Sequence, residues 1–211
     1  DVLGSRGLGD VYKRQVYDFS LGNPATPAPE AVKEAIKRIL DEKDPMFVHG
    51  YMDNSGYEDV RQAVADNLNH RFDTHFDFHN IIMTVGAAGG LNIIFKTILD
   101  PGDEVLVFAP YFGEYNSYAA NFDAKTVAVH PDPETFQPDL GDFAAKFTEK
   151  TKAVIINTPN NPTGVVYSDA TLKAIADILK EKQKAYKKEI YLVSDEPYRC
   201  LLYTSPSPRD P

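Results

Sequence analysis

Cysteine is almost absent from this sequence, and its scarcity excludes two kinds of site. The 211 residues include one cysteine, Cys200, so the chain can form neither an internal disulfide nor a cysteine-based zinc site. A protein that uses no disulfide fits a reducing compartment, and we expect a cytoplasmic location.

Excess positive charge and long apolar runs are lacking too. A formal net charge of −9 argues against nucleic acid or an anionic membrane as a partner. No apolar run approaches the length of a membrane span, and residues 1–15 lack the charged start and apolar core of a signal peptide. With 43% hydrophobic and 25% charged residues, the composition is typical of a globular domain.

The two ends of the chain differ in character from the rest. Residues 1–15 show no regular period, and residues 200–211 join a short apolar patch to serine, proline and charged residues. We interpret both as linker- or adapter-derived tails, with ordinary disordered tails as the alternative. Fold reasoning is therefore restricted to residues 16–199.

Helical and strand patterns alternate along the second half of this stretch. Apolar runs of strand length occur at 81–85, 105–109, 126–129, 153–156 and from residue 190 onward. Helical spacing is found between them, and upstream after Pro29 and after Ser55–Glu58, which matches a capping box. Strands that alternate with helices predict a mostly parallel sheet covered on both faces, a three-layer αβα sandwich.

One cluster of polar residues admits two interpretations. The alternation of histidines and aspartates could supply metal ligands, but a solvated polar connector is the interpretation we favour, so no metal site is predicted; the residues are His70, Asp73, His75, Asp77 and His79.

Polar residues follow two of the predicted strands. Asp195 ends the last apolar run and is followed by Pro197 and Tyr198, while Asn161 lies in the loop after the run at 153–156. Open α/β sheets bind ligands at the carboxyl ends of their strands, so these side chains are candidates for one site. A turn sequence and an ordinary strand end are the alternatives.

A turn of small residues precedes another helical pattern. Gly86–Gly89 would offer backbone N–H groups and the positive end of a helix to an anion, although tight packing alone could also explain it. The turn is not a dinucleotide fingerprint, because the third glycine of that motif would fall at Leu91.

The segments NNPTG at 160–164 and SDEPY at 194–198 together resemble the class I/II aminotransferases that depend on pyridoxal phosphate, the aspartate aminotransferase-like group of fold type I. The resemblance covers residues 16–199. It implies an N-terminal arm and helix over 16–45, and over 46–199 the first part of an incomplete large domain that binds pyridoxal 5'-phosphate.

The resemblance implies roles around the cofactor ring. Asp195 would pair with the pyridinium nitrogen and make the ring a better electron sink. Asn161 and Tyr198 would donate hydrogen bonds to the phenolic oxygen, and Asp195 and Tyr198 would count as catalytic. We also predict a cis peptide bond between Asn161 and Pro162.

Further roles concern the phosphate and the substrate. The backbone amides of Ala87 and Ala88 would hold the phosphate, and Phe112 would stack on the ring unless it is an ordinary core aromatic. Tyr51 would reach the phosphate of a second subunit, with a loop aromatic as the alternative. Gly22 would offer its N–H to the substrate carboxylate.

The implied reaction is the transfer of an amino group between an amino acid and a 2-oxo acid by a homodimer. The family's Schiff-base lysine follows the Asp–Tyr strand, and no residue of this sequence, Lys96 included, matches it. We therefore predict that this chain is an inactive fragment. A pyridoxal-phosphate lyase on the same fold, a non-catalytic ligand-binding module and a truncated reading frame are the alternatives.

Overall fold

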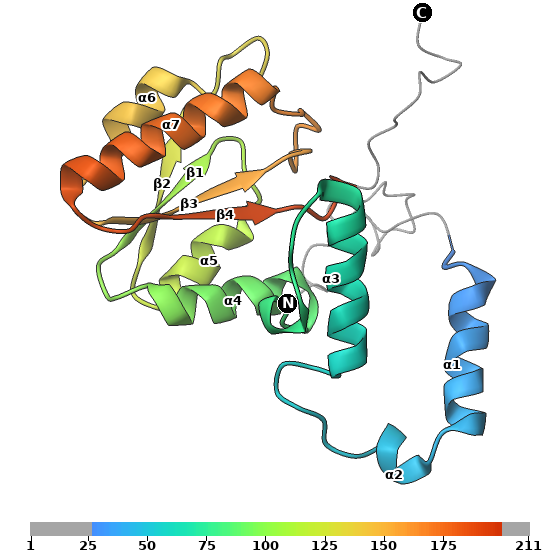
Figure 1. Cartoon of the computed structure of the whole chain (residues 1–211). Coiled ribbons are helices and arrows are strands. Elements are labelled where there is room, and N and C mark those ends of the chain that lie inside the picture. Colours follow the sequence, from blue (N-terminus) through green and yellow to red (C-terminus); the bar gives the residue numbers. More distant parts are fainter. Residues whose placement is uncertain (1–26, 200–211) are drawn as a thin grey trace, which may run out of the picture. The chain divides into compact units, whose positions relative to one another are not determined.

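The computed structural model describes residues 27–199, and the chain divides into two compact units between Asn54 and Ser55 (Figure 1). The predicted site residue Gly22 lies outside the described residues. In the first unit, α1 (Glu30–Glu42) and α2 (Pro45–Val48) follow each other closely. The α2 helix begins with Pro45, and the Asp44 side chain caps it by accepting a hydrogen bond of 2.7 Å from the Met46 amide.

The second unit begins with α3 (Glu58–Phe72) and the short 3₁₀ helix η2 (Phe78–Asn80). The expected capping box at Ser55 is wrong: the helix starts later, with Tyr57 at its N-cap and no side-chain cap. Gly56 adopts a φ of +95°, which turns the chain away from the helical path before α3 can start. Buried Arg61 fixes this turn, donating from Nε to the Gly56 carbonyl at 3.0 Å and from its guanidinium to the Phe78 carbonyl at 2.8 Å.

Four parallel strands form the sheet that carries the site. They are β1 (Glu104–Phe108), β2 (Lys125–Val129), β3 (Thr151–Asn157) and β4 (Tyr191–Asp195), in the order β2-β1-β3-β4. Parallel neighbours need crossover connections, which are supplied here by α5 (Glu114–Ala120), α6 (Leu140–Lys146) and α7 (Asp169–Tyr186). The helix α4 (Gly86–Ile98) leads into β1.

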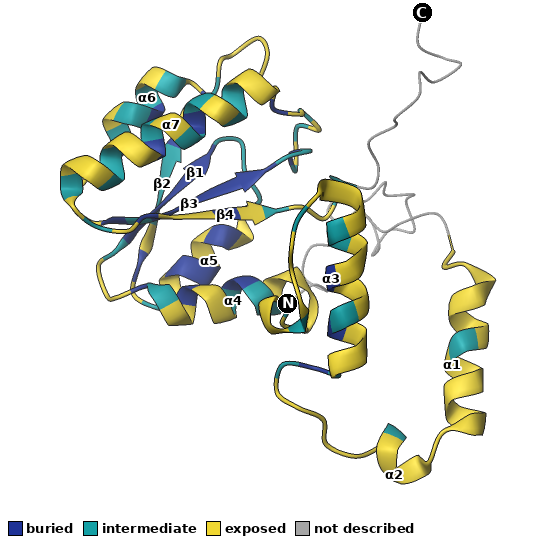
Figure 2. Ribbon diagram, in the orientation of Figure 1, coloured by how far each residue is buried: buried dark blue, intermediate teal, exposed yellow. Residues whose placement is uncertain are grey.

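Helices cover both faces of this sheet, α4 and α5 on one and α6 and α7 on the other (Figure 1). Alternate side chains of β1 enter opposite cores: Val105 and Val107 pack with α4 and α5, whereas Leu106 and Phe108 pack with α6 and α7. Figure 2 shows the buried inner strands β1 and β3 and the exposed outer sides of the helices. The predicted three-layer αβα sandwich with a parallel sheet is therefore confirmed.

The strand expected at Ile81–Val85 is wrong. None of the four described strands pairs with these residues. The Met83 amide donates instead to the Ser55 carbonyl at 2.9 Å, and the Val85 side chain is 94% exposed. A strand requires a hydrogen-bonded neighbour as well as an apolar run, and the described sheet offers no neighbour at this position.

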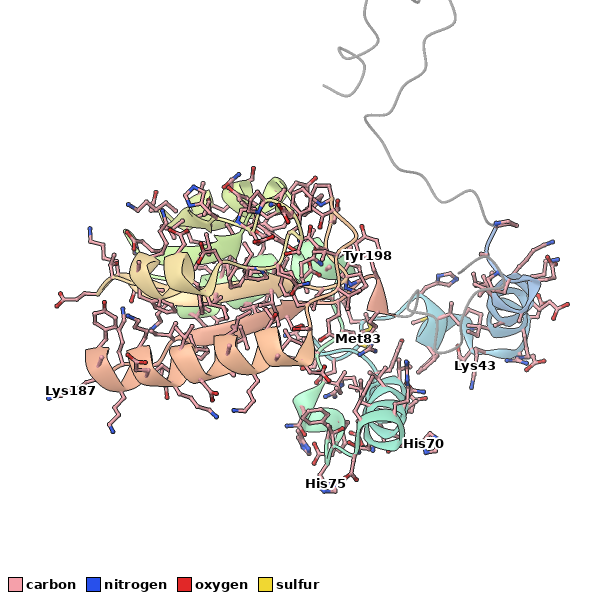
Figure 3. All side chains as sticks on the ribbon, turned by 90° about the horizontal axis from the view of Figure 1, so that it is seen from above. Lys43, His70, His75, Met83, Lys187 and Tyr198 are labelled. Carbon is pink, nitrogen blue, oxygen red and sulfur yellow. The ribbon has the colours of Figure 1, made fainter. Side chains whose placement is uncertain are left out.

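Residues 27–199 contain neither a cluster of metal ligands nor a helix that could span a membrane. No three His, Cys, Asp or Glu side chains are grouped so that they could hold a metal ion, and exposed His70 and His75 project outward around α3 and the loop after it (Figure 3). None of the helices there combines the length and the apolar character needed to cross a bilayer.

Candidate active site

A pocket of about 290 Å³ lies where β3 and β4 end. Six residues that the sequence singled out line it together: Ala87, Ala88, Phe112, Asn161, Asp195 and Tyr198. Further lining residues were not predicted, namely Glu114, Tyr115, Tyr118, Asn157 and Pro197. The fold thus gathers the start of α4, the segment after β1, α5 and the ends of β3 and β4 around one cavity.

Strand register explains why Asp195 and the asparagine loop are neighbours. The last residues of β3 and β4, Asn157 and Asp195, are partners in the parallel ladder. The Asn157 side chain is 5% exposed; its Nδ2 donates to the Asp195 carbonyl at 2.9 Å, and its Oδ1 accepts from the Asn161 amide at 2.6 Å. Asn157 therefore joins both strand ends to the loop. Its place at the end of a buried apolar run was the available signal.

The loop after β3 presents Asn161 toward the end of β4. Its Nδ2 lies 3.4 Å from the hydroxyl oxygen of Tyr198, which is a long and weak hydrogen bond. Tyr198 follows β4 at the same edge of the sheet (Figure 3). The Asn161–Pro162 peptide bond is cis, so that prediction is confirmed. Nearby Asn160 braces the loop by accepting from the Thr163 amide and hydroxyl at 3.1 and 2.8 Å.

The Asp195 carboxylate has a partner that sequence patterns did not reveal. The Tyr115 hydroxyl donates to its Oδ2 at 2.6 Å, and the Tyr115 side chain is 1% exposed. Burial and then this hydrogen bond raise the pKa of Tyr115 far above its usual value. The phenol therefore stays protonated and acts as the donor.

A second tyrosine–carboxylate pair lies on the same helix. The Tyr118 hydroxyl donates to Glu114 Oε2, and both residues line the pocket. Burial and then this hydrogen bond raise the pKa of Tyr118 to about 12. Two carboxylates, Asp195 and Glu114, thus border the cavity, whereas no lysine or arginine is among its described lining residues.

The start of α4 borders the pocket with small residues. Ala87 and Ala88 lie in its first turn, where backbone N–H groups have no partner within the helix, and no side chain caps this end. Gly86, with a φ of +69°, allows the sharp entry into the helix. The cavity therefore combines an end suited to an anion with a carboxylate elsewhere in its wall.

The comparison with known proteins decides the family. The family model for class I and II aminotransferases matches residues 14–210. This chain belongs to the class I and II aminotransferase family. The resemblance inferred from the two motifs is thereby confirmed, and the family uses pyridoxal phosphate.

Similarity to individual aminotransferases supports the same family assignment. The chain is 34% identical over 189 residues to an aspartate aminotransferase of Pyrococcus horikoshii, covering 89% of this chain and 46% of the relative. It is 37% identical to an aspartate/prephenate aminotransferase of Thermus thermophilus, and the match covers 90% of this chain and 48% of the relative. A solved amino transferase from Eubacterium rectale superposes with a TM-score of 0.89 at 40% identity, covering 98% and 52%. The chain spans about half the length of the curated relatives it matches.

The structure places Phe112 beside the pocket and against the core, and its stacking on the cofactor ring stays a prediction. It lines the pocket, and its half-buried ring also packs edge-on against Tyr115 with centroids 5.7 Å apart. By contrast, Lys96 is not a lining residue, and its ammonium lies 5.8 Å from the centre of the Phe122 ring. Tyr51, in the first unit, is fully exposed, and its predicted role toward a second subunit stays a prediction.

Proposed function

We propose that the pocket holds pyridoxal 5'-phosphate and that the complete protein moves an amino group between an amino acid and a 2-oxo acid. One observation carries the proposal: residues suited to the phosphate, the ring nitrogen and the phenolic oxygen of this cofactor, chosen from separate sequence motifs, line a single cavity. Its volume of about 290 Å³ is close to the lower end of the range for small-molecule sites.

The phosphate would lie at the start of α4. The amides of Ala87 and Ala88 are donors at the positive end of a helix of 13 residues. A side chain added at Gly86 would meet nothing within 4 Å, so the space beside the turn is open to a ligand. This end of the cavity would therefore stabilise the doubly negative phosphate.

The ring nitrogen would meet Asp195. A carboxylate can accept several hydrogen bonds, so the one from Tyr115 to Oδ2 leaves capacity for a protonated ring nitrogen. The cofactor, when bound, supplies an electron sink for the carbanion at the substrate's α-carbon. Asp195 would keep positive charge on that ring, and Asn161 and Tyr198 would donate to its phenolic oxygen.

The chain of 211 residues is not expected to turn over substrate by itself. No lysine is among the described residues that line the pocket, and the chain spans about half of its relatives' length. We place the lysine that holds the cofactor's aldehyde in the part of the complete protein beyond this span. We also propose a homodimer, because the fully exposed Tyr51 then gains a partner surface.

Binding of pyridoxamine 5'-phosphate to the purified chain tests the cofactor site. This probe has no aldehyde, so it cannot react with surface lysines, and calorimetry reports its affinity. Unphosphorylated pyridoxamine should bind far more weakly, because it lacks the group that the α4 amides hold. Asp195→Asn should weaken binding of the phosphorylated probe by about tenfold, the scale of one charged hydrogen bond.

Glu196→Gln is the matched control. This neighbouring carboxylate is exposed, accepts a hydrogen bond of 2.7 Å from Ser194 Oγ, and does not line the pocket. Its affinity for the probe should equal that of the unsubstituted chain. Absence of binding by the unsubstituted chain, or equal losses in the two variants, would refute the proposed site.

A further inference from the structure

Tyr115 has the surroundings of a fixed anchor. It is among the largest fully buried side chains, and its ring packs edge-on against Phe112 and nearly parallel to Tyr111 at a centroid distance of 6.4 Å. The same core cluster includes Val193, two residues before Asp195 on β4. A ring packed on several sides cannot move far, so its hydroxyl is a fixed point in the pocket wall.

Asp195 is held less completely. Its backbone is fixed by the β3–β4 ladder and by the bond from Asn157 to its carbonyl. Asp195 is only half-buried, and pairing in the ladder fixes its backbone but not the rotamer of its carboxylate. Within residues 27–199, the hydrogen bond that fixes the carboxylate is the one from Tyr115.

We infer that Tyr115 is a positioning residue of the cofactor site. Its hydroxyl holds Asp195 Oδ2 so that the second carboxylate oxygen is presented to the ring nitrogen of the cofactor. The inference rests on the proposed function, since it takes the ring nitrogen as the partner of Asp195. Tyr115 itself makes no bond to the reacting atoms.

The chain offers a matched control three residues further along α5. Tyr118 is also buried and lines the same pocket, but its hydroxyl donates to Glu114. Tyr118→Phe and Tyr115→Phe therefore remove the same group from the same helix. They differ in which carboxylate loses its donor.

The experiment compares two ligands that differ at one atom. Pyridoxamine 5'-phosphate carries the ring nitrogen, and its carbocyclic analogue has a C–H group in that place. Tyr115→Phe should weaken binding of the first by about tenfold and of the second by less than twofold, because only the first uses the oriented carboxylate. Tyr118→Phe should change the affinity for the two ligands to the same extent, because the bond from Tyr115 to Asp195 is kept.

A double-variant cycle gives an independent readout. With Asp195→Asn already present, Tyr115→Phe should have little further effect on binding of pyridoxamine 5'-phosphate. Far-UV circular dichroism checks that each variant is folded. If Tyr115→Phe does not fold, Tyr115→His takes its place in the same cycle: any affinity for pyridoxamine 5'-phosphate that it loses should not be lost again once Asp195→Asn is present.

The outcomes separate the two proposals. Equal losses of affinity for both ligands in Tyr115→Phe would overturn the positioning role while leaving the cofactor site intact. A loss in Tyr118→Phe that falls on pyridoxamine 5'-phosphate alone would overturn it as well. A folded, unsubstituted chain that binds no pyridoxamine 5'-phosphate would overturn the proposed function and this inference with it.

Discussion

Replacing Asn157 by Asp should damage the edge of the sheet on which the pocket is built. The change keeps an oxygen to accept from the Asn161 amide but replaces the Nδ2 donor, 2.9 Å from the Asp195 carbonyl, with a second oxygen. A buried carbonyl thereby loses its donor and faces negative charge instead. The site is 5% exposed, so water offers little compensation.

The magnitude follows from the groups left unpaired. A buried acceptor without a donor costs about 1–3 kcal/mol, and repulsion between the two oxygens adds to that. We therefore expect the free energy of unfolding to fall by about 2–4 kcal/mol at pH 7. That is a large part of the roughly 5–15 kcal/mol that stabilises a typical domain.

Urea denaturation followed by circular dichroism measures this loss, and pH separates its causes. Protonation of the introduced carboxyl restores a donor toward the Asp195 carbonyl, so the loss should shrink between pH 7 and pH 4. Asn160→Asp is the control: Asn160 is 6% exposed, and its Oδ1 bonds to the Thr163 amide and hydroxyl would be kept. If the two variants lose equal stability at pH 7, the linking role of Asn157 is wrong.

Three further predictions concern other parts of the second unit. Gly56→Ala should lower the free energy of unfolding in urea melts by more than about 2 kcal/mol, because φ is +95° and the added carbon would lie 2.6 Å from a methionine side chain. Gly102→Ala is the control: its φ is +89° but an added carbon meets no atom within 4 Å, so it should lose only about 1 kcal/mol. Phe143→Ala, in the core under α6 and α7, should lose about 3–5 kcal/mol by the same assay, and a loss below 1 kcal/mol would contradict its packing. Hydrogen bonds from the backbone and side chain of His130, and the charge of nearby Lys146, lower the pKa of Asp142 in the folded protein. Ionised Asp142 therefore stabilises the fold at a pH above its pKa in the unfolded chain, and this stabilisation is lost as the pH falls through its pKa in the folded protein. Melting temperatures below about pH 4 should therefore fall less steeply for Asp142→Asn, and an unchanged slope would argue against this effect.

The hydrophobic pattern of the sequence predicted most of the fold. The runs at 105–109, 126–129 and 153–156 match β1, β2 and β3 to within a residue or two at each end. The inner strands β1 and β3 are buried on both faces, so their runs are almost entirely apolar. The run at 81–85 has the same character but pairs with none of the described strands. An apolar pattern reports a tendency to pair and cannot report whether a neighbour is present.

The sequence predicted those pocket residues that lie within recognisable motifs. Asn161 and Asp195 stand in short segments whose resemblance to a family could be read directly, and they line the same cavity. Tyr115 and Asn157 were missed for a physical reason. Their importance lies in hydrogen bonds to Asp195 across 80 and 38 positions of sequence, which follow only once the strand order is known.

The order β2-β1-β3-β4 has a consequence for how the chain acquires its pocket in time. The strand β1 pairs with its successor β2 on one edge, and β3 must then add to the opposite edge before β4 can join. Pairings between distant segments form slowly because a long loop must close first. Until β4 docks, the rim of β3 is an open template for another chain, and refolding at high concentration should favour aggregates. Affinity for a ligand in this cavity is therefore expected to be the last native property to return after dilution from denaturant, later than the helical signal.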